Sequence, residues 1–184
     1  MMRNLLYLFL VMIVFAACKS PEARKPIQSS SGSFIKESAV RNKKIFEIEE
    51  ARISELMQAN PQHEYKASEN GFWYYYNIED TIATVSPQFG DEVTFTFDIK
   101  DLDGTTILSE VENGLQLYKV DQSNQDLISG LRDGIKLMNV GEQVTFLFPS
   151  YKAYGYYGIE DKLGTNIPVQ STVTLKTLVQ PEEN

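Results

Sequence analysis

Residues 127–158, LISGLRDGIKLMNVGEQVTFLFPSYKAYGYYG, decide the fold of this 184-residue chain. In the first third of the stretch, apolar side chains recur at spacings of three and four, at Ile128, Leu131, Ile135 and Met138. This period predicts a short helix that ends before Gly141. Residues 142–148 are rich in β-branched and aromatic side chains, which predicts a strand. The stretch closes with tyrosines between glycines, which indicates a loop whose tyrosines could bind an extended chain.

Further strands flank this helix and strand on both sides. Residues 92–99 alternate apolar and polar side chains, so the face that carries Phe97 is expected to point inward. Residues 71–76 and 171–179 are also typical of strands. Four or five strands around one short helix indicate an antiparallel α+β domain, which we place over residues 65–180.

An amphipathic helix is predicted before this domain, over residues 37–60. Isoleucines and leucines recur at helical spacing between charged residues, and Asn60-Pro61 ends the run. Two interpretations are open. The helix packs on its own domain, which we favour, or it serves for homodimerisation or for docking a partner of a larger apparatus.

The N-terminus predicts export and a lipid anchor. Arg3 precedes an apolar run over residues 5–17, which is shorter than the ~20 residues that a membrane-spanning helix needs and fits a signal peptide over residues 1–17. Phe15-Ala16-Ala17-Cys18 resembles a bacterial lipobox, which implies acylation of Cys18. The alternative is a secretory signal whose cysteine is incidental. Residues 18–36, rich in serine and proline, are expected to form a flexible tether.

Composition excludes several kinds of site. With one cysteine, the chain can form neither an intramolecular disulfide nor a cysteine-based zinc cluster. With one histidine, it cannot form a site of several imidazoles. The sequence Asp101-Leu-Asp-Gly104 contains only a fragment of a calcium loop and predicts a tight turn. A net charge of −8 argues against a nucleic acid partner. We therefore expect neither a metal nor another cofactor.

The order of motifs resembles FKBP-type peptidyl-prolyl cis-trans isomerases over about residues 68–180. The motifs are Gly90-Asp-Glu-Val93, Asp103-Gly104, Leu127-Ile-Ser-Gly130, Met138-Asn-Val-Gly-Glu142, Phe148-Pro149, Ala153-Tyr-Gly155 with Gly158, and Ile167-Pro168. The resemblance implies a bent antiparallel sheet wrapped over a short helix. Lipobox, tether, charged helix and Gly71-Phe-Trp-Tyr-Tyr-Tyr76 together also look like the FKBP-type lipoproteins associated with gliding motility in Bacteroidetes-like bacteria.

Matched position by position, the resemblance implies Phe97, Ile128 and Tyr154 as the catalytic residues. The backbone amide of Ile128 and the hydroxyl of Tyr154 are the expected donors to substrate. The implied substrate-binding residues are Ile107, Leu115, Leu117, Leu127, Leu131 and Leu175. Several depart from the family pattern, because Phe97 lacks the usual hydroxyl, Leu108 replaces an aspartate, and Leu131 and Leu175 replace aromatic rings.

The resemblance implies an isomerase that acts on proline-containing clients while they fold in the cell envelope. The expected location is the periplasmic face of the outer membrane, with Cys18 as the anchor. Because ring surface is lost, several alternatives stay open. The chain is an isomerase of reduced activity, an isomerase that prefers larger residues before proline, or a non-catalytic proline-binding chaperone or structural lipoprotein of a motility or secretion apparatus.

Overall fold

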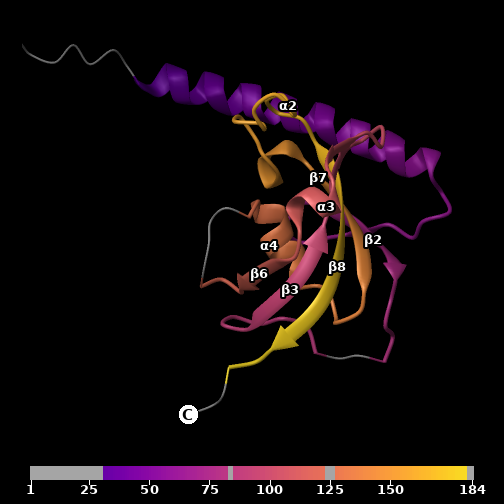
Figure 1. Cartoon of the computed structure of the whole chain (residues 1–184). Coiled ribbons are helices and arrows are strands. Elements are labelled where there is room, and N and C mark those ends of the chain that lie inside the picture. The colour runs from indigo at the N-terminus through magenta and orange to yellow at the C-terminus, as the bar shows by residue number, and fades with distance from the viewer. Residues whose placement is uncertain (1–30, 83–84, 123–126, 182–184) are drawn as a thin grey trace, which may run out of the picture. The chain divides into compact units, whose positions relative to one another are not determined.

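The computed structural model describes residues 31–82, 85–122 and 127–181 of the chain (Figure 1). The predicted signal peptide, Cys18 and the tether as far as residue 30 lie outside these residues. Among the described helices, none is both long and apolar enough to cross a bilayer.

An antiparallel sheet of eight strands forms the centre of the fold. The main path runs in the order β1 (Lys66–Ala67), β2 (Trp73–Ile78), β7 (Gln143–Phe148), β8 (Val169–Val179), β3 (Glu92–Phe97) and β6 (Gln116–Lys119). Beside it, β4 (Ile99–Asp101) pairs with both β5 (Thr106–Leu108) and β8. The long strand β8 therefore pairs with three strands, β3, β4 and β7. Because of this pairing, the strands predicted from sequence form one sheet.

Helix α4 (Ser129–Ile135) lies against one face of this sheet (Figure 1). Its two glycines make the close approach possible. A Cβ atom at Gly130 would lie 2.6 Å from the Phe148 ring, and one at Gly134 would lie 2.8 Å from the Phe146 ring. The two phenylalanine rings are themselves stacked, with centroids 5.4 Å apart. The core thus forms where the helix backbone rests directly on aromatic rings of β7.

Helix α2 (Ser31–Ala59) packs on the domain through its C-terminal half. From Ala39 onward it belongs to the same compact unit as the sheet. Ile53 is fully buried and forms a second apolar cluster with Leu102 and Leu147. Other apolar positions of the helix, such as Ile48, stay exposed. The structure therefore agrees with the interpretation that the helix packs on its own domain.

The sequence-based elements hold with shifts at their ends. Helix α2 begins at Ser31, six residues before the expected Glu37, so the tether was predicted too long. Helix α4 is shorter than expected, because the chain turns after Ile135. At the predicted hairpin, the Gly104 amide donates to the Asp101 carbonyl over 3.1 Å and Gly104 has a φ of 91°. Glycine adopts this conformation without steric cost.

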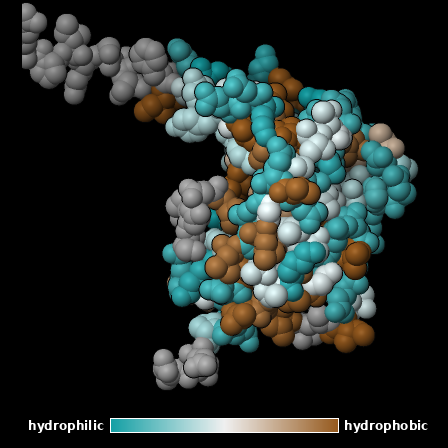
Figure 2. Space-filling model, viewed as in Figure 1, coloured by the Kyte–Doolittle hydropathy of each residue, from teal (hydrophilic) through white to brown (hydrophobic). Residues whose placement is uncertain are grey.

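The short strands β1, β5 and β6 and the one-turn helix α3 (Glu110–Asn113) were not predicted. Helix α3 has a clear local cause, because the Ser109 and Glu112 side chains form a reciprocal capping box. Surface apolar residues are scattered. In the view of Figure 2 they appear as separate brown patches among hydrophilic residues.

Candidate functional site

One hydrophobic cluster contains most of the site residues predicted from sequence. Phe97, Ile128, Leu131 and Leu175 are buried members of this cluster, and Ile107, Leu127 and Tyr154 are partly buried side chains packed against it. They come from β3, β5, β8, α4 and the loop after β7. Residues almost 80 positions apart in the sequence are therefore collected on one side of the sheet.

Tyr154 lies at the surface of the cluster, in a loop with defined backbone geometry. The 3-10 turn η1 (Ser150–Lys152) starts this loop, and the Ser150 carbonyl accepts hydrogen bonds from the amides of Ala153 and Gly155 at 3.0 and 2.8 Å. Burial raises the pKa of Tyr154 to about 12. Its hydroxyl has no hydrogen-bond partner in the described part of the chain, so it is a protonated donor that is free to bind a ligand.

Ile128 supplies a second free donor. It is the N-cap of α4, and its amide donates to no acceptor among the described residues. The reason is general, since the first N–H groups of a helix have no partner within the helix. The Ile128 side chain, only 9% exposed, meanwhile joins the apolar cluster. A backbone donor and an apolar surface therefore lie at the same position.

Leu131 and Leu175 lie deeper than a direct substrate contact requires. Their side chains are 1% and 0% exposed. Leu175 pairs with Phe95 across β8 and β3, whereas Leu131 projects from α4. These leucines lie beneath the other site residues. The surface available to a ligand is therefore formed by Phe97, Ile128 and Tyr154, with the partly buried Ile107 and Leu127.

The mid-domain wall expected at Leu115 and Leu117 is not formed by these residues. Their side chains are 65% and 66% exposed and lie outside the cluster. Leu117 pairs with Thr94, whose side chain points away from the core, and Gln116 pairs with buried Phe95. Because side chains alternate along a strand, Gln116 faces the cluster in place of Leu117. The sequence predicted no strand here, and a shift of one residue along β6 exchanges the two faces.

Two further side chains hold the rim of the site. The Asn113 side-chain amide donates to the Phe97 carbonyl over 3.0 Å, and the Gln116 amide donates to the Asn113 carbonyl. Neither residue was predicted from the sequence, because single polar residues at the ends of short elements carry no periodic signal. The capping box at Ser109 is the one local pattern that could have located this segment.

A buried carboxylate outside the predicted set also bears on the site. Glu49 of α2 is 4% exposed and accepts hydrogen bonds from the Ser150 amide at 2.8 Å and the Ser150 hydroxyl at 2.7 Å. Ser150 is the residue whose carbonyl organises the turn before Tyr154. Helix α2 is thus attached to the loop that carries the tyrosine.

Sequence comparison supports the geometry. Residues 83–179 match the family model of the FKBP-type peptidyl-prolyl cis-trans isomerases. The probable FKBP-type peptidyl-prolyl cis-trans isomerase FkpA of Neisseria meningitidis serogroup B is 32% identical over 96 residues. That match covers 52% of this chain and 34% of the relative, so the chain matches about a third of its length.

Solved structures share the fold. A peptidyl-prolyl cis-trans isomerase from Pseudomonas syringae pv. tomato superposes with a TM-score of 0.59 at 19% identity, over 75% of this chain and 96% of the other. FkpA from Escherichia coli superposes with a TM-score of 0.54 at 17% identity, over 92% and 78%. By its matched family model, the chain belongs to the FKBP-type peptidyl-prolyl cis-trans isomerase family.

Proposed function

We propose that this chain is a lipid-anchored peptidyl-prolyl isomerase that accelerates cis–trans isomerisation of X–Pro bonds while proteins of the cell envelope fold. One observation carries the proposal. The Tyr154 hydroxyl and the Ile128 amide, two donors with no partner in the described residues, accompany one apolar cluster. In a site of this kind, the two donors bind carbonyl oxygens of the peptide and the apolar cluster binds its proline ring.

The chemistry needs no nucleophile. Rotation about a peptide bond has a barrier of ~18–20 kcal/mol, because the nitrogen lone pair is delocalised into the carbonyl group. The planar amide is more charge-separated than the twisted one, so an apolar surface that excludes water favours the twisted state. Donors that hold the flanking carbonyls fix the chain on either side of the rotating bond. The site then lowers the barrier by binding the transition state more tightly than the substrate.

The test is an isomerisation assay on proline tetrapeptides that differ in the residue before proline. We expect acceleration that depends on this residue, and a loss of about tenfold in kcat/KM for Tyr154→Phe, as expected for one lost hydrogen bond worth about 1.4 kcal/mol in the transition state. Tyr157→Phe is the matched control, because Tyr157 is 92% exposed. No acceleration with any peptide would refute the enzyme proposal.

A second candidate is a chaperone that binds proline-containing segments without turning them over. It is favoured by the exposure of Tyr151, Tyr156 and Tyr157 and by the deep burial of Leu131 and Leu175, where the family carries aromatic rings. If it is correct, the chain suppresses aggregation of an unfolded client equally well with Tyr154→Phe, and it fails to accelerate isomerisation.

The anchor and the location are part of the proposal. They are supported by the apolar run over residues 5–17 and by the lipobox-like residues that end at Cys18. We expect labelled palmitate to enter the wild-type chain and not Cys18→Ala, and the variant to leave the outer-membrane fraction. A role in gliding motility or secretion rests on sequence resemblance alone. Its test is whether a deletion strain loses movement and regains it with the wild-type gene.

A further inference from the structure

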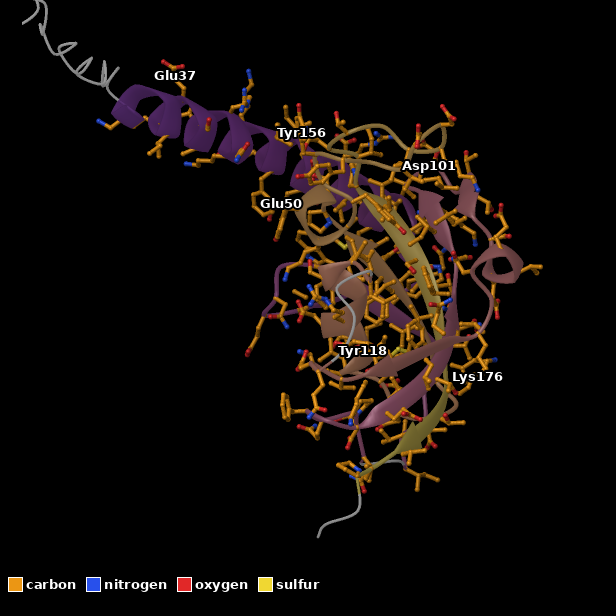
Figure 3. All side chains as sticks on the ribbon, turned by 60° about the vertical axis from the view of Figure 1, so that its left-hand side comes forward. Glu37, Glu50, Asp101, Tyr118, Tyr156 and Lys176 are labelled. Carbon is orange, nitrogen blue, oxygen red and sulfur yellow. The ribbon has the colours of Figure 1, made fainter. Side chains whose placement is uncertain are left out.

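A groove of about 1130 Å³ lies between α2 and the segment that follows β7. It is lined on one side by residues of the helix such as Ile45 and Phe46, and on the other by Tyr151, Gly155 and Tyr156. None of the site residues predicted from sequence lines it. Figure 3 labels Tyr156, which lines the groove, and Glu50 of α2.

Aromatic side chains give the groove its apolar surface. The rings of Phe46 and Tyr151 lie with their centroids 5.6 Å apart, so the two sides are in contact at one point. Tyr151 is 51% exposed and Tyr156 is 76% exposed. Exposed tyrosines present a large apolar ring and a polar tip, which suits contact with polypeptide at low cost in side-chain entropy.

The groove is formed before any ligand arrives. At its base, Glu49 accepts hydrogen bonds from the backbone amide and the hydroxyl of Ser150. The Tyr151 hydroxyl donates to the Gly71 carbonyl over 2.9 Å. Because both sides are fixed, binding would require little ordering of the protein.

The groove and the isomerase site share one loop of the chain. Tyr154 belongs to that site, and the next two residues, Gly155 and Tyr156, line the groove. The Gly155 carbonyl accepts a hydrogen bond from the Asn166 amide at 2.7 Å, which holds the far end of the same loop. The loop that carries Tyr154 therefore also forms one side of the groove.

The rim of the groove is basic although the whole chain carries a net charge of −8. Arg41 and Lys43 line it and are exposed. No carboxylate in the described residues lies within salt-bridge distance of Arg41, and Lys43 has one exposed pair with Glu47 at 3.8 Å. Such an exposed pair is weak. Ser150 does not neutralise Glu49, and burial followed by the charges of Glu50 and Glu49 raises the pKa of Tyr151. Acidic residues of a ligand are therefore favoured at the end of the groove that carries Arg41 and Lys43.

We infer that this groove binds the segment of the client polypeptide next to the proline being isomerised, and that it prefers a segment with apolar and acidic residues. The inference rests on the proposed function. From Arg41 to Glu49 the helix rises about 12 Å, at ~1.5 Å per residue. An extended chain covers that distance with about four residues, at ~3.3 Å each.

The test compares a proline tetrapeptide with the same peptide extended by about six residues that include aspartate and phenylalanine. The extension is made at the N-terminus in one series and at the C-terminus in another. With the full chain in mild detergent, we expect one of the extensions to lower KM about tenfold, a gain of about 1.4 kcal/mol in binding. The double variant Arg41→Glu, Lys43→Glu and the variant Tyr156→Ser remove this gain and leave the kcat/KM of the tetrapeptide unchanged.

Lys176→Glu is the matched control, because Lys176 is an exposed lysine of β8 placed well away from Tyr156 in Figure 3. Equal KM values for short and extended peptides in the wild-type chain would refute the inference while the isomerase stands. If the wild-type chain turns over no peptide, the proposed function fails instead. The groove is then tested by fluorescence anisotropy of the extended peptides. Binding lost in the Arg41, Lys43 and Tyr156 variants supports the groove as a peptide-binding site, and binding retained in them refutes it.

A photocrosslinking residue at position 156 identifies the occupant. With the extended peptide present, we expect the adduct to contain the peptide. An adduct with the chain's own N-terminal residues, or with a second copy of the chain, that persists under saturating peptide would refute the inference, because another occupant would then fill the groove.

Discussion

At the scale of single residues, the proposed site contains a tyrosine whose pKa lies well above its ordinary value. Burial raises the pKa of Tyr154 to about 12, and burial followed by the nearby Glu142 charge raises that of Tyr76 to about 12. Both hydroxyls therefore stay protonated at every pH at which the protein would act. Tyr76 donates to the Leu137 carbonyl at 3.2 Å, whereas the Tyr154 hydroxyl is available to a ligand.

This burial predicts a loss of stability at alkaline pH. An unfolded tyrosine releases its proton near pH 10, and these two release it near pH 12 in the folded chain. Between those values the folded state binds more protons, so the free energy of unfolding falls as pH rises, by at most about 1.4 kcal/mol per pH unit for each tyrosine. Urea unfolding from pH 9 to 12 measures it. The fall of the free energy of unfolding with pH should be less steep in Tyr154→Phe. An unchanged slope would contradict the raised pKa of Tyr154.

Gly130 offers a second test at the residue scale. An added Cβ atom would lie 2.6 Å from the Phe148 ring and 2.9 Å from the Lys152 carbonyl, with no free space to enter. We expect Gly130→Ala to lower the free energy of unfolding by about 2 kcal/mol, the usual cost of overpacking. Gly164→Ala is the control, since its Cβ would meet only an Ile167 carbon at 3.7 Å. If both variants unfold at the same urea concentration, α4 does not rest on β7 as described.

At the scale of elements, the connection between α2 and η1 is the feature that extends the domain beyond the family's matched residues. Its hydrogen bonds join one buried carboxylate, Glu49, to one serine, Ser150, beside the ring contact of Phe46 and Tyr151. We expect Glu49→Ala to lower the free energy of unfolding by about 3 kcal/mol, because a hydrogen bond to a charged group is lost and the Ser150 amide is left buried without a partner. Urea unfolding checks this. The neighbouring exposed Glu50→Ala should change stability by less than about 0.5 kcal/mol, and an equal effect would show that no special connection exists.

At the scale of the whole molecule, α2 completes the domain by covering apolar surface. Ile53 is buried against Leu102 and Leu147, with Trp73 packed beside them. A chain that begins at Tyr65 exposes this cluster. We expect its free energy of unfolding, measured with urea, to be lower by about 3 kcal/mol or more. We also expect it to self-associate in sedimentation experiments. A chain that begins at Ala39 keeps these contacts and should match the full chain. Equal stability of both shortened chains would show that α2 is dispensable for folding.

The amino-acid sequence by itself determined the elements with strong local signals. The helix period at Ile128 to Met138, the alternation through Phe97 and the Asp103-Gly104 turn all depend on neighbours within a few residues. Each element was found, although the helix ends at Ile135. The roles of Ile128 and Tyr154 came from the resemblance of the motif order to a known family, and they stay predictions. The elements follow from chain chemistry alone, because periodicity and turn preference are properties of local backbone geometry.

Only the tertiary structure decided the register of β6 and the position of α2. A shift of one residue places Gln116, not Leu117, against the cluster, and it is the pairing with β3 that fixes this choice. Likewise, nothing near Glu49 in the sequence indicates Ser150, 101 residues away. Contacts between distant segments depend on how surfaces fit after folding. The groove between α2 and the segment after β7, formed by such contacts, is therefore visible only in the folded chain.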